Sequence, residues 1–391
     1  MDENTPIAEE GVPEDKKKKK KKRSATVRAV LAAVLTLILV GAAVLIFLYR
    51  DRLTGEGLRE SLGISSHIGS ESAAFTYENG SDLTFAPMGD GFAVASASGV
   101  QLLDSAGQTV AKEVCSVAVP AVWANKSMAL FCDIGGSTCK AVYTDGRCVD
   151  IEAGDSIISA SVSSGGCFAV ISEESGSKGL VRVFNSECTL LYEWFSGTGY
   201  PLSAQVSPDN RLLSVLCLAN TGTVLHFFRL NSEDELASFS VDGRLFFDLR
   251  FMADDRVCIV SEDGLLFVDS SGTQKGAYDF SGRYMGAYCF SSGGFAAVCL
   301  SEYRTGTGGT VLTLDSDGRV LGSADSENDI LFLSAAGKQV LSATGGSITL
   351  YSQTMAPVKS AETLVTARRM FLRERGDVLL LSSYSAEIFD F

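Results

Sequence analysis

A recurring unit constrains the fold of this 391-residue chain more than any other feature of its sequence. Each unit reads as a turn, a short apolar strand, a break, a second strand and a turn rich in Asp, Asn, Ser and Gly. The apolar strands align at these positions: Phe92, Met128, Phe168, Leu212, Val257, Phe295, Val340 and Val378. The aligned positions lie 36 to 45 residues apart, and four-stranded propeller blades repeat at about 40–45 residues. We predict an all-β fold, an eight-bladed β-propeller, with seven blades as the alternative if one unit is degenerate.

The ends of this region suggest how the ring closes. The chain stops at Phe391, directly after the second strand of the eighth unit, and two strand-like runs, 73–77 and 83–85, precede the first unit. We expect both runs to complete the outer half of the last blade, which would leave no free sheet edge where the ring ends meet.

An uncharged apolar run at residues 29–49 is the second strong feature. At about 1.5 Å per residue, this run spans roughly 30 Å, the thickness of the hydrocarbon core of a bilayer. Seven lysines at 16–22 and Arg23 precede the run, and an excess of Lys and Arg marks the cytoplasmic flank. A cleaved signal peptide is the alternative, but its apolar region would be shorter and would end at a small-residue cleavage site. We expect an uncleaved signal anchor, with the N-terminus in the cytoplasm and the C-terminal domain outside the cell membrane.

Charge divides the chain in the same way. The net charge is −14 for the whole chain and +3 for residues 1–28, which leaves −17 for the rest. An acidic domain does not attract nucleic acid electrostatically, and the basic block is explained by its place beside the apolar run. We predict a disordered cytoplasmic segment at 1–28, a transmembrane helix at 29–49, a juxtamembrane connector at 50–70 and an extracytoplasmic propeller at 71–391.

Ten cysteines raise the question of disulfides. Five fall in the apolar strand of successive units: Cys132, Cys167, Cys217, Cys258 and Cys299. An exported domain can be oxidised, but free cysteine also packs as a small apolar residue, and we favour packing in a buried ring near the propeller axis. The other five offer no C-x-x-C pair and no zinc-like spacing: Cys115, Cys139, Cys148, Cys188 and Cys289.

Histidine and tryptophan offer little to an active site. The chain contains only His67, in the connector, and His226, within an apolar strand. We interpret His226 as a strand residue rather than a general base. Trp123 and Trp194 are interpreted as blade-packing residues, although either could stack on a sugar. No nucleophile elbow, H-E-x-x-H pair or phosphate-binding loop occurs in the sequence.

Carboxylates are numerous but lack a catalytic pattern. Residues 315–318 resemble a fragment of a calcium loop without the twelfth-position ligand, so we predict a turn. The acidic strings 173–174 and 233–235 are expected in solvated loops between strands. Asp209 and Asp254 would support an enzyme only if they gathered around one cavity. No catalytic, cofactor-binding or metal-ligating residue is assigned, and no cofactor is expected.

Residues 204–213, read as AQVSPDNRLL, resemble the turn and strand of WD40-like propellers, with Asn210 where glycine is usual. The basic N-terminus, the apolar run, the connector and the segment 190–195 are together similar to a family of single-span membrane proteins of Gram-positive bacteria of unknown function. This resemblance implies a membrane-anchored propeller and lends no site residue. Quinoprotein propellers also have eight blades, but their recurring tryptophan docking motif needs more than two tryptophans.

Three functions remain open. The favoured hypothesis is a cell-surface binding scaffold that presents its loops to a protein, peptide or cell-wall partner, which rests on architecture. The second is an extracytoplasmic enzyme of the glycosidase or lyase type, which uses loop carboxylates. The third is an accessory or sensory subunit of a membrane complex. The sequence leaves the partner, the binding loops, the oligomeric state and any disulfide pairing open.

Overall fold

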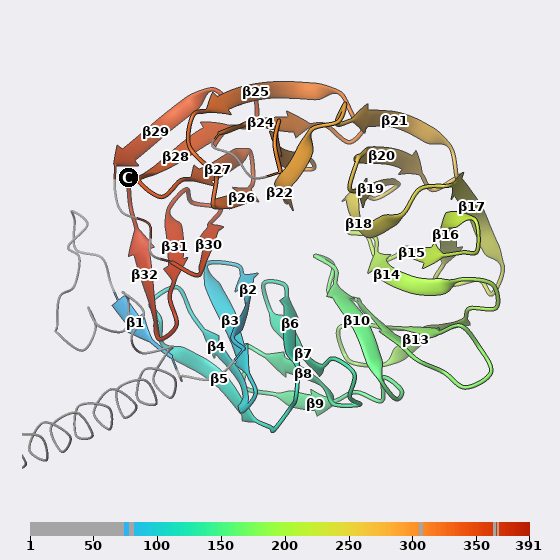
Figure 1. The fold of residues 1–391 in the computed structure, drawn as a ribbon. Coiled ribbons are helices and arrows are strands. Elements are labelled where there is room, and N and C mark those ends of the chain that lie inside the picture. The colour runs from blue at the N-terminus through green and yellow to red at the C-terminus, as the bar shows by residue number, and fades with distance from the viewer. Residues whose placement is uncertain (1–73, 78–81, 305–307, 363–364, 366) are drawn as a thin grey trace, which may run out of the picture. The chain divides into compact units, whose positions relative to one another are not determined.

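Eight four-stranded antiparallel sheets follow one another around a ring (Figure 1). A computed structural model describes residues 74–77, 82–304, 308–362, 365 and 367–391. The predicted all-β, eight-bladed propeller is confirmed. Within these ranges no helix has the length and apolar character needed to cross a membrane. The predicted anchor at 29–49, the segment before it and the connector lie outside the described residues.

Each of the first four blades is a run of consecutive strands. Blade 1 contains β2 (Thr84–Met88), β3 (Gly91–Ser96), β4 (Gly99–Leu103) and β5 (Thr109–Val114). Blade 2 contains β6 (Pro120–Ala124), β7 (Met128–Asp133), β8 (Cys139–Tyr143) and β9 (Cys148–Asp150). Blade 3 contains β10 (Ile157–Val162), β11 (Phe168–Ser172), β12 (Leu180–Phe184) and β13 (Leu190–Phe195). Blade 4 contains β14 (Tyr200–Val206), β15 (Leu212–Leu218), β16 (Gly222–Arg229) and β17 (Glu235–Asp242).

The next three blades follow the same order, and the eighth borrows its outer strand from the start of the propeller. Blade 5 contains β18 (Phe246–Ala253), β19 (Arg256–Ser261), β20 (Gly264–Asp269) and β21 (Gln274–Asp279). Blade 6 contains β22 (Tyr284–Phe290), β23 (Ala296–Ser301), β24 (Gly309–Leu314) and β25 (Val320–Ser326). Blade 7 contains β26 (Phe332–Ala336), β27 (Gln339–Ala343), β28 (Ser347–Ser352) and β29 (Pro357–Glu362). Blade 8 contains β30 (Arg369–Leu372), β31 (Val378–Leu381), β32 (Ser385–Phe389) and β1 (Ala74–Thr76).

Ring closure follows the prediction in one strand and departs from it in the other. As predicted, the first strand-like run forms the outer strand of the last blade, since β1 pairs antiparallel with β32. Tyr77 continues this seam, because its hydroxyl donates a hydrogen bond to the backbone oxygen of Ser385 at 3.0 Å. The prediction for residues 83–85 was wrong. Thr84 and Phe85 begin β2, the innermost strand of blade 1, where their partners are Ala95 and Val94 of β3.

The apolar strand that opened each predicted unit is the second strand of its blade, not the first. Second strands are covered by neighbouring blades on both faces, so they read as continuous apolar runs: β3 and β11 are buried at every position. Fourth strands lie at the outer edge and alternate, as β21 does between exposed and half-buried positions. The repeat was therefore recognised from the middle of each blade, and its edges were missed.

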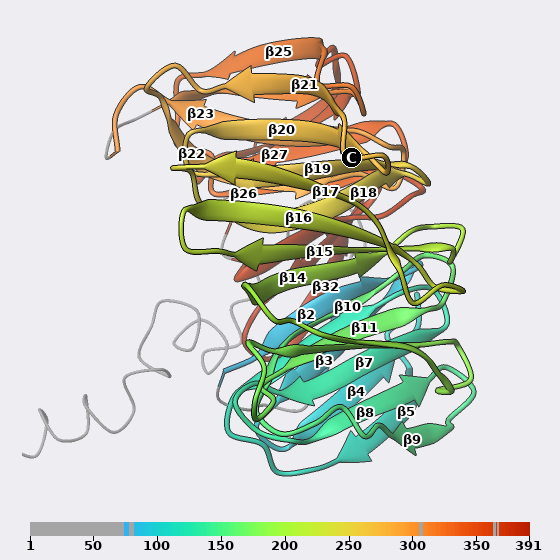
Figure 2. The ribbon, with the colours of Figure 1, turned by 90° about the vertical axis from the view of Figure 1, so that its right-hand side faces the viewer.

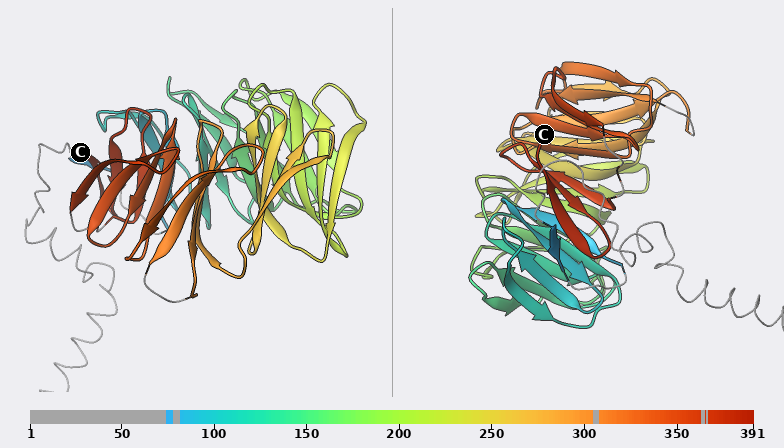
Figure 3. Two further views of the ribbon diagram at one scale, coloured as in Figure 1. Left: turned by 90° about the horizontal axis from the view of Figure 1, so that it is seen from above. Right: turned by 90° about the vertical axis from the view of Figure 1, so that its left-hand side faces the viewer.

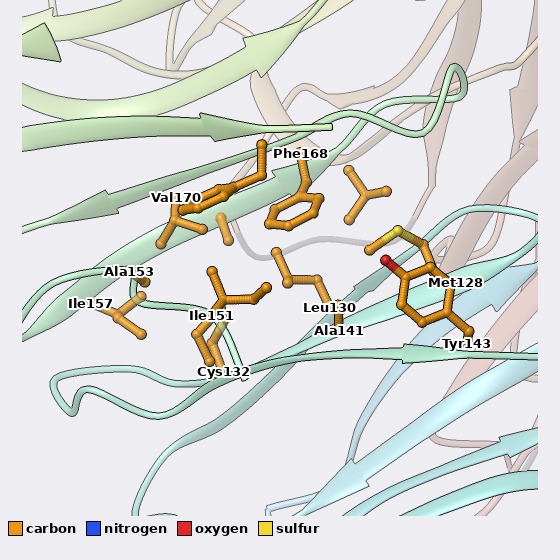
Figure 4. Packing of buried hydrophobic residues seen from close by; sticks show 14 residues of the cluster. Met128, Leu130, Cys132, Ala141, Tyr143, Ile151, Ala153, Ile157, Phe168 and Val170 are labelled. Carbon is orange, nitrogen blue, oxygen red and sulfur yellow. Dashed lines mark hydrogen bonds between the residues drawn. The ribbon is translucent and has the colours of Figure 1, made fainter. Parts of the chain in front are cut away.

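The core is divided between the blades. Its eight apolar clusters each draw side chains from two neighbouring blades. Figure 4 shows the cluster between blades 2 and 3, where Leu130 and Cys132 of one blade face Phe168 and Val170 of the next. Because neighbouring sheets pack face to face through these clusters, burial of apolar surface between the faces holds the ring together. Figure 2 labels β14 to β17, the four strands of the sheet that forms blade 4.

The antiparallel order fixes two sets of loops at opposite ends of the strands, which Figure 3 shows from the side. We call upper loops those that connect the second to the third strand of a blade, and those that lead from a fourth strand into the next blade. Lower loops connect the first to the second strand and the third to the fourth. The upper face comprises the upper loops and the strand ends that border them, and the lower face is its counterpart.

Candidate interaction face

Exposed apolar side chains gather on the upper face. Of the sixteen large apolar side chains that are exposed in the described residues, eleven lie in upper loops or at the strand ends beside them. They are Val114, Val119, Ile158, Phe195, Tyr200, Leu218, Leu245, Phe247, Tyr284, Tyr303 and Leu331. The other five lie near the lower ends of outer strands: Val110, Leu190, Leu191, Val320 and Val358. The two faces therefore differ in what they offer a partner.

All five exposed aromatic side chains of the described residues lie on the upper face of four consecutive blades, 3 to 6. We call this set the aromatic arc: Phe195, Tyr200, Phe247, Tyr284 and Tyr303. When a partner binds, an aromatic side chain buries a large area and loses little conformational entropy. Aromatic residues are therefore enriched among those that dominate the binding energy of protein interfaces. The arc is therefore the part of the surface best suited to bind a partner.

Charged side chains hold two members of the arc in place. The ammonium group of Lys178 lies 4.7 Å from the ring centroid of Tyr200 and donates a hydrogen bond to its hydroxyl at 3.1 Å. The guanidinium carbon of Arg304 lies 5.9 Å from the ring centroid of Tyr284, and Arg304 also pairs with Glu262 of blade 5 at 3.4 Å. Aromatic rings with charged neighbours match the apolar centre and polar rim typical of protein interfaces.

A polar network supports the arc from the innermost strands of blades 4, 5 and 6. The hydroxyl of Tyr288 donates a hydrogen bond to the Asp248 carboxylate at 2.9 Å, and the ring of Phe247 packs edge-on against Tyr288. Arg250 donates to the side-chain oxygen of Gln205 at 3.4 Å. Burial raises the pKa of Asp248 above its ordinary value. Burial, followed by the nearby Asp248 charge, raises the pKa of Tyr288. The network links three blades beneath Phe247.

A cavity of about 280 Å³ opens on the upper side of blade 6 and includes Tyr303 in its wall. Its other walls carry Arg283 and three carboxylates, Glu302, Asp325 and Glu327. The volume lies just below the roughly 300–1,000 Å³ of typical small-molecule sites, and such sites are mostly apolar. The cavity fits better as a polar recess beside the arc than as a small-molecule pocket.

The five cysteines that were predicted to lie in the core are buried, but they do not form the predicted ring near the propeller axis. All five side chains are buried in the core, which agrees with the interpretation that they pack between blades. The expected ring near the axis was wrong. Cys217 of β15 and Cys258 of β19 belong to second strands, one step outward from the axis, and pack in separate clusters between blades.

Three of the aromatic and histidine residues singled out in the sequence pack against other side chains: Trp123, Trp194 and His226. Trp194 packs between blades 3 and 4, with its ring centroid 5.3 Å from that of His226 and 5.0 Å from that of Phe228. Nδ1 of His226 lies 2.8 Å from Oε1 of Glu235, the residue that opens the neighbouring strand β17. Trp123 packs against the core between blades 2 and 3. His67 lies outside the described residues.

The carboxylates behave as turn and surface residues. Oδ1 of Asp315 accepts hydrogen bonds from the backbone nitrogens of Asp317 and Arg319, both at 2.9 Å, so residues 315–318 form the predicted turn. Residues 173–174 and 233–234 lie in loops, as predicted, but Glu235 is the first residue of β17, so the prediction of a loop was wrong at that position. Asp209 accepts a hydrogen bond from Ser207 Oγ at 2.6 Å within its own turn. Asp254 lies in the corresponding lower loop of blade 5, between β18 and β19. Neither aspartate lines the 280 Å³ cavity.

A family model described as a family of unknown function (DUF5711) matches residues 69–382. The chain belongs to this family. The matched range covers every strand of the eight blades except β32 of blade 8. No curated protein matches the chain.

Solved propellers resemble this chain in structure at low sequence identity. BamB from Moraxella catarrhalis superposes with a TM-score of 0.53 at 15% identity, over 82% of this chain and 99% of its own. Sqt1 from Chaetomium thermophilum, bound to the N-terminus of the ribosomal protein L10, gives 0.56 at 12%, over 82% and 100%. The C-terminal WD40 domain of Sif2 gives 0.58 at 10%, over 83% and 100%. At these identities the likeness shows the fold alone.

The aromatic arc was not predicted from the sequence. Four members lie at or beside a strand end, as Tyr200 and Tyr284 do at the starts of β14 and β22, and Tyr303 lies in the loop after β23. A single exposed apolar residue carries no signal. The four members share one position in the repeat: each lies within three residues of the connection between one blade and the next. Reading it required the boundaries of first and fourth strands, which the repeat did not reveal.

Proposed function

We propose that this protein is a membrane-anchored, extracytoplasmic binding module whose aromatic arc holds a protein or peptide partner. The arc carries the proposal: every exposed aromatic side chain of the described residues lies on one face of four adjacent blades. The acidic charge outside residues 1–28 disfavours nucleic acid as the partner. A solved propeller of this fold, Sqt1, holds the N-terminus of another protein, which supports a peptide-like ligand for the fold.

The anchor and the orientation rest on the apolar run at 29–49 and the basic block before it. An amine reagent that does not cross membranes tests both on intact cells. We expect it to modify Lys126 and Lys359, which the structure places on the propeller surface, and to spare the lysines at 16–22. Modification of the basic block in intact cells, with the propeller lysines spared, would show the opposite orientation, with the N-terminus outside the cell.

The partner is tested by recovery of the full-length chain from its native membrane in mild detergent, followed by mass spectrometry. The decisive variant replaces Phe195 and Tyr200 with serine. The matched control replaces Leu190 and Leu191, also with serine. These two leucines lie on the same strand, β13, as Phe195, and their exposed fractions of 47% and 42% are close to the 52% of Phe195.

We expect the wild type and the Leu190/Leu191 control to recover the same near-stoichiometric protein. We expect the arc variant to recover at least about tenfold less, since truncation of a hot-spot aromatic side chain costs about 2 kcal/mol or more. Equal recovery by both variants would remove the arc from the binding site. Substrate turnover by the purified wild type, unaffected by the arc variant, would favour the enzyme hypothesis instead.

A further inference from the structure

Two cysteines face each other across the β7–β8 hairpin of blade 2. Cys132 and Cys139 are direct partners in the register, and their sulfur atoms lie 3.4 Å apart. The backbone nitrogen of Asp133 donates to the oxygen of Thr138 at 2.9 Å, so those two residues form the adjacent hydrogen-bonded pair. Because the two types of pair alternate along an antiparallel ladder, Cys132 and Cys139 occupy a non-hydrogen-bonded position, where side chains come closest.

This position has the spacing that a disulfide requires. Facing Cα atoms of a non-hydrogen-bonded pair lie about 4.5 Å apart, within the roughly 4.4–6.8 Å that disulfides span. The two sulfur atoms have only to close from 3.4 Å to the bond length of about 2.05 Å. In the other seven blades, the second and third strands pair no two cysteines. The juxtaposition is specific to blade 2.

The surroundings explain when such a bond would form. Both side chains are buried, at 0% and 2% exposure, within the core between blades 2 and 3 (Figure 4 labels Cys132). The hydrogen bond to Cys139 and burial raise the pKa of the Cys132 thiol. The thiolate is the reacting form, so the folded, reduced pair reacts slowly. Oxidation therefore belongs to the stage at which the hairpin is formed but not yet covered by blade 3.

We propose that Cys132 and Cys139 form a cross-strand disulfide when the chain folds in contact with a disulfide-bearing oxidant. One thiolate attacks the oxidant disulfide and releases one reduced thiol, which leaves a mixed disulfide on the protein. The second cysteine thiolate then attacks the protein-bound sulfur and releases the second reduced thiol. Two protein thiols are oxidised, one oxidant disulfide is reduced, and the protons pass to the released thiols.

The bond would brace an upper loop. The hairpin carries the upper loop 134–138, and Oδ1 of Asp133 accepts hydrogen bonds from the backbone nitrogens of Ala118 and Val119, at 3.0 and 2.8 Å. The connection from blade 1 into blade 2 is therefore tied to the residue next to Cys132. Closing the hairpin covalently fixes both upper loops of blade 2 relative to each other.

Trypsin makes the pair easy to observe. Cleavage after Lys126 and Lys140 gives one peptide, residues 127–140, that contains both cysteines. Cleavage after Arg147 and Lys178 gives a control peptide, residues 148–178, that contains Cys148 and Cys167, between which the structure shows no sulfur contact. The full chain is unfolded, refolded in glutathione redox buffers, denatured with N-ethylmaleimide and digested.

We expect peptide 127–140 to lose both maleimide labels and two hydrogen atoms as the oxidised glutathione fraction rises. The control peptide keeps both labels at about tenfold higher ratios of oxidised to reduced glutathione, because a well-placed protein disulfide resists reduction more than an unassisted pair. Circular dichroism and a cooperative urea transition confirm that the oxidised sample has refolded. In Cys139→Ala, Cys132 keeps its label or carries glutathione at every ratio.

Two labels on peptide 127–140 in the refolded wild type under oxidising buffer would overturn the proposal, as would glutathione on either cysteine without the intramolecular bond. A sample that fails to refold is replaced by protein isolated from its native cells in the presence of N-ethylmaleimide. There, an unlabelled 127–140 peptide supports the disulfide and a doubly labelled one overturns it. The refolding result does not depend on where the protein resides, so it stands or falls separately from the proposed location.

Discussion

The upper and lower faces of this propeller differ in the contacts that their loops make. Lower loops bind their neighbours: Asn125 donates to the backbone oxygen of Ser163 at 3.1 Å, and Asn210 to that of Gly165 at 2.7 Å. Further round the ring, Ser291 donates to the backbone oxygen of Gly337 at 2.6 Å. Upper loops instead expose the aromatic arc. The hydrogen bonds between lower loops therefore lie apart from the surface offered to a partner, and we expect variants in lower loops to change stability without changing that surface.

The largest effect is expected at the lower loop of blade 8, where the ring closes. Arg373 and Asp377 form a buried ion pair, with Arg373 Nε donating to Asp377 Oδ1 at 2.8 Å. Arg373 also donates to the backbone oxygen of Asp90 in blade 1, at 2.8 Å. Asp377→Ala leaves a buried guanidinium without its carboxylate. We expect the free energy of unfolding to fall by about 3–5 kcal/mol, measured by urea denaturation.

The same loop contains the control. Glu374 pairs with Lys126 at 3.2 Å, but both side chains are largely exposed. Such pairs contribute about 0–1 kcal/mol, so Glu374→Ala should leave the urea midpoint nearly unchanged. If the two variants were equally stable, the lower loop of blade 8 would not be holding the ring closed. Partner recovery by the folded fraction of either variant should match the wild type.

A second lower-loop effect is expected at Asn210, which adopts a left-handed φ of 59°. Its amide nitrogen donates to Gly165, and its side-chain oxygen accepts from Ser163 Oγ at 2.8 Å. Asn210→Gly suits the backbone but removes both links to blade 3, so we expect a loss of about 1–2 kcal/mol. Asn210→Ala loses the same bonds and adds backbone strain, about 1 kcal/mol more. An increase in the unfolding free energy of the glycine variant would show that backbone fit outweighs the links.

Asn210 also shows how far sequence reasoning reached. Its turn was recognised as part of a blade, with asparagine where glycine is usual, and the left-handed backbone there agrees with that interpretation. The two bonds that its side chain makes to blade 3 were not foreseeable, since they join residues about 45 positions apart. The conformation of a turn depends on the residues within it, so it can be predicted from a short stretch of sequence. Contacts between blades depend on how two sheets are placed relative to each other, so they cannot.

The fold was more predictable than the face for a related reason. Eight middle-strand runs repeat at one period, and burial on both sides makes each one continuous and apolar, as in β19. First and fourth strands carry exposed positions among less exposed ones, as β2 and β21 do, so their boundaries do not stand out in the sequence. Four of the five members of the aromatic arc lie at such boundaries, and Tyr303 lies in the loop between β23 and β24. Only the ring topology brings Phe195 and Tyr303 to one face, because they are separated by more than two blades of sequence.

On the upper face, the next effect is expected at Asp248, beneath Phe247. Burial raises the pKa of Asp248 in the folded state above its value in the unfolded chain. The folded state therefore binds more protons between the two pKa values, and the unfolding free energy falls as pH rises through that window. Asp248→Asn cannot titrate, and its amide oxygen can still accept from Tyr288.

We expect Asp248→Asn to show a smaller loss of stability than the wild type when urea denaturation is compared at pH 4 and pH 7. The difference should stay below the roughly 1 kcal/mol of a single neutral hydrogen bond, since the side chain is only half-buried. A steeper loss in the variant would reverse the sign assigned to Asp248.

The smallest effect is expected at Asp263, in the upper loop of blade 5. Its Oδ1 accepts hydrogen bonds from Arg244 and from Ser261 Oγ, both at 2.6 Å. Arg244 above all holds the pKa of Asp263 below its usual range, so this pair stabilises the fold above the pKa of the unfolded carboxyl and is lost as pH falls through the folded value. Asp263 is 64% exposed, which limits the contribution to about 0.2–1 kcal/mol. Asp263→Asn should therefore flatten the acid limb of stability slightly, which urea denaturation at decreasing pH measures. A loss at pH 7 on the scale of Asp377→Ala would mean that upper loops also hold the ring, and the separation between the two faces would fail.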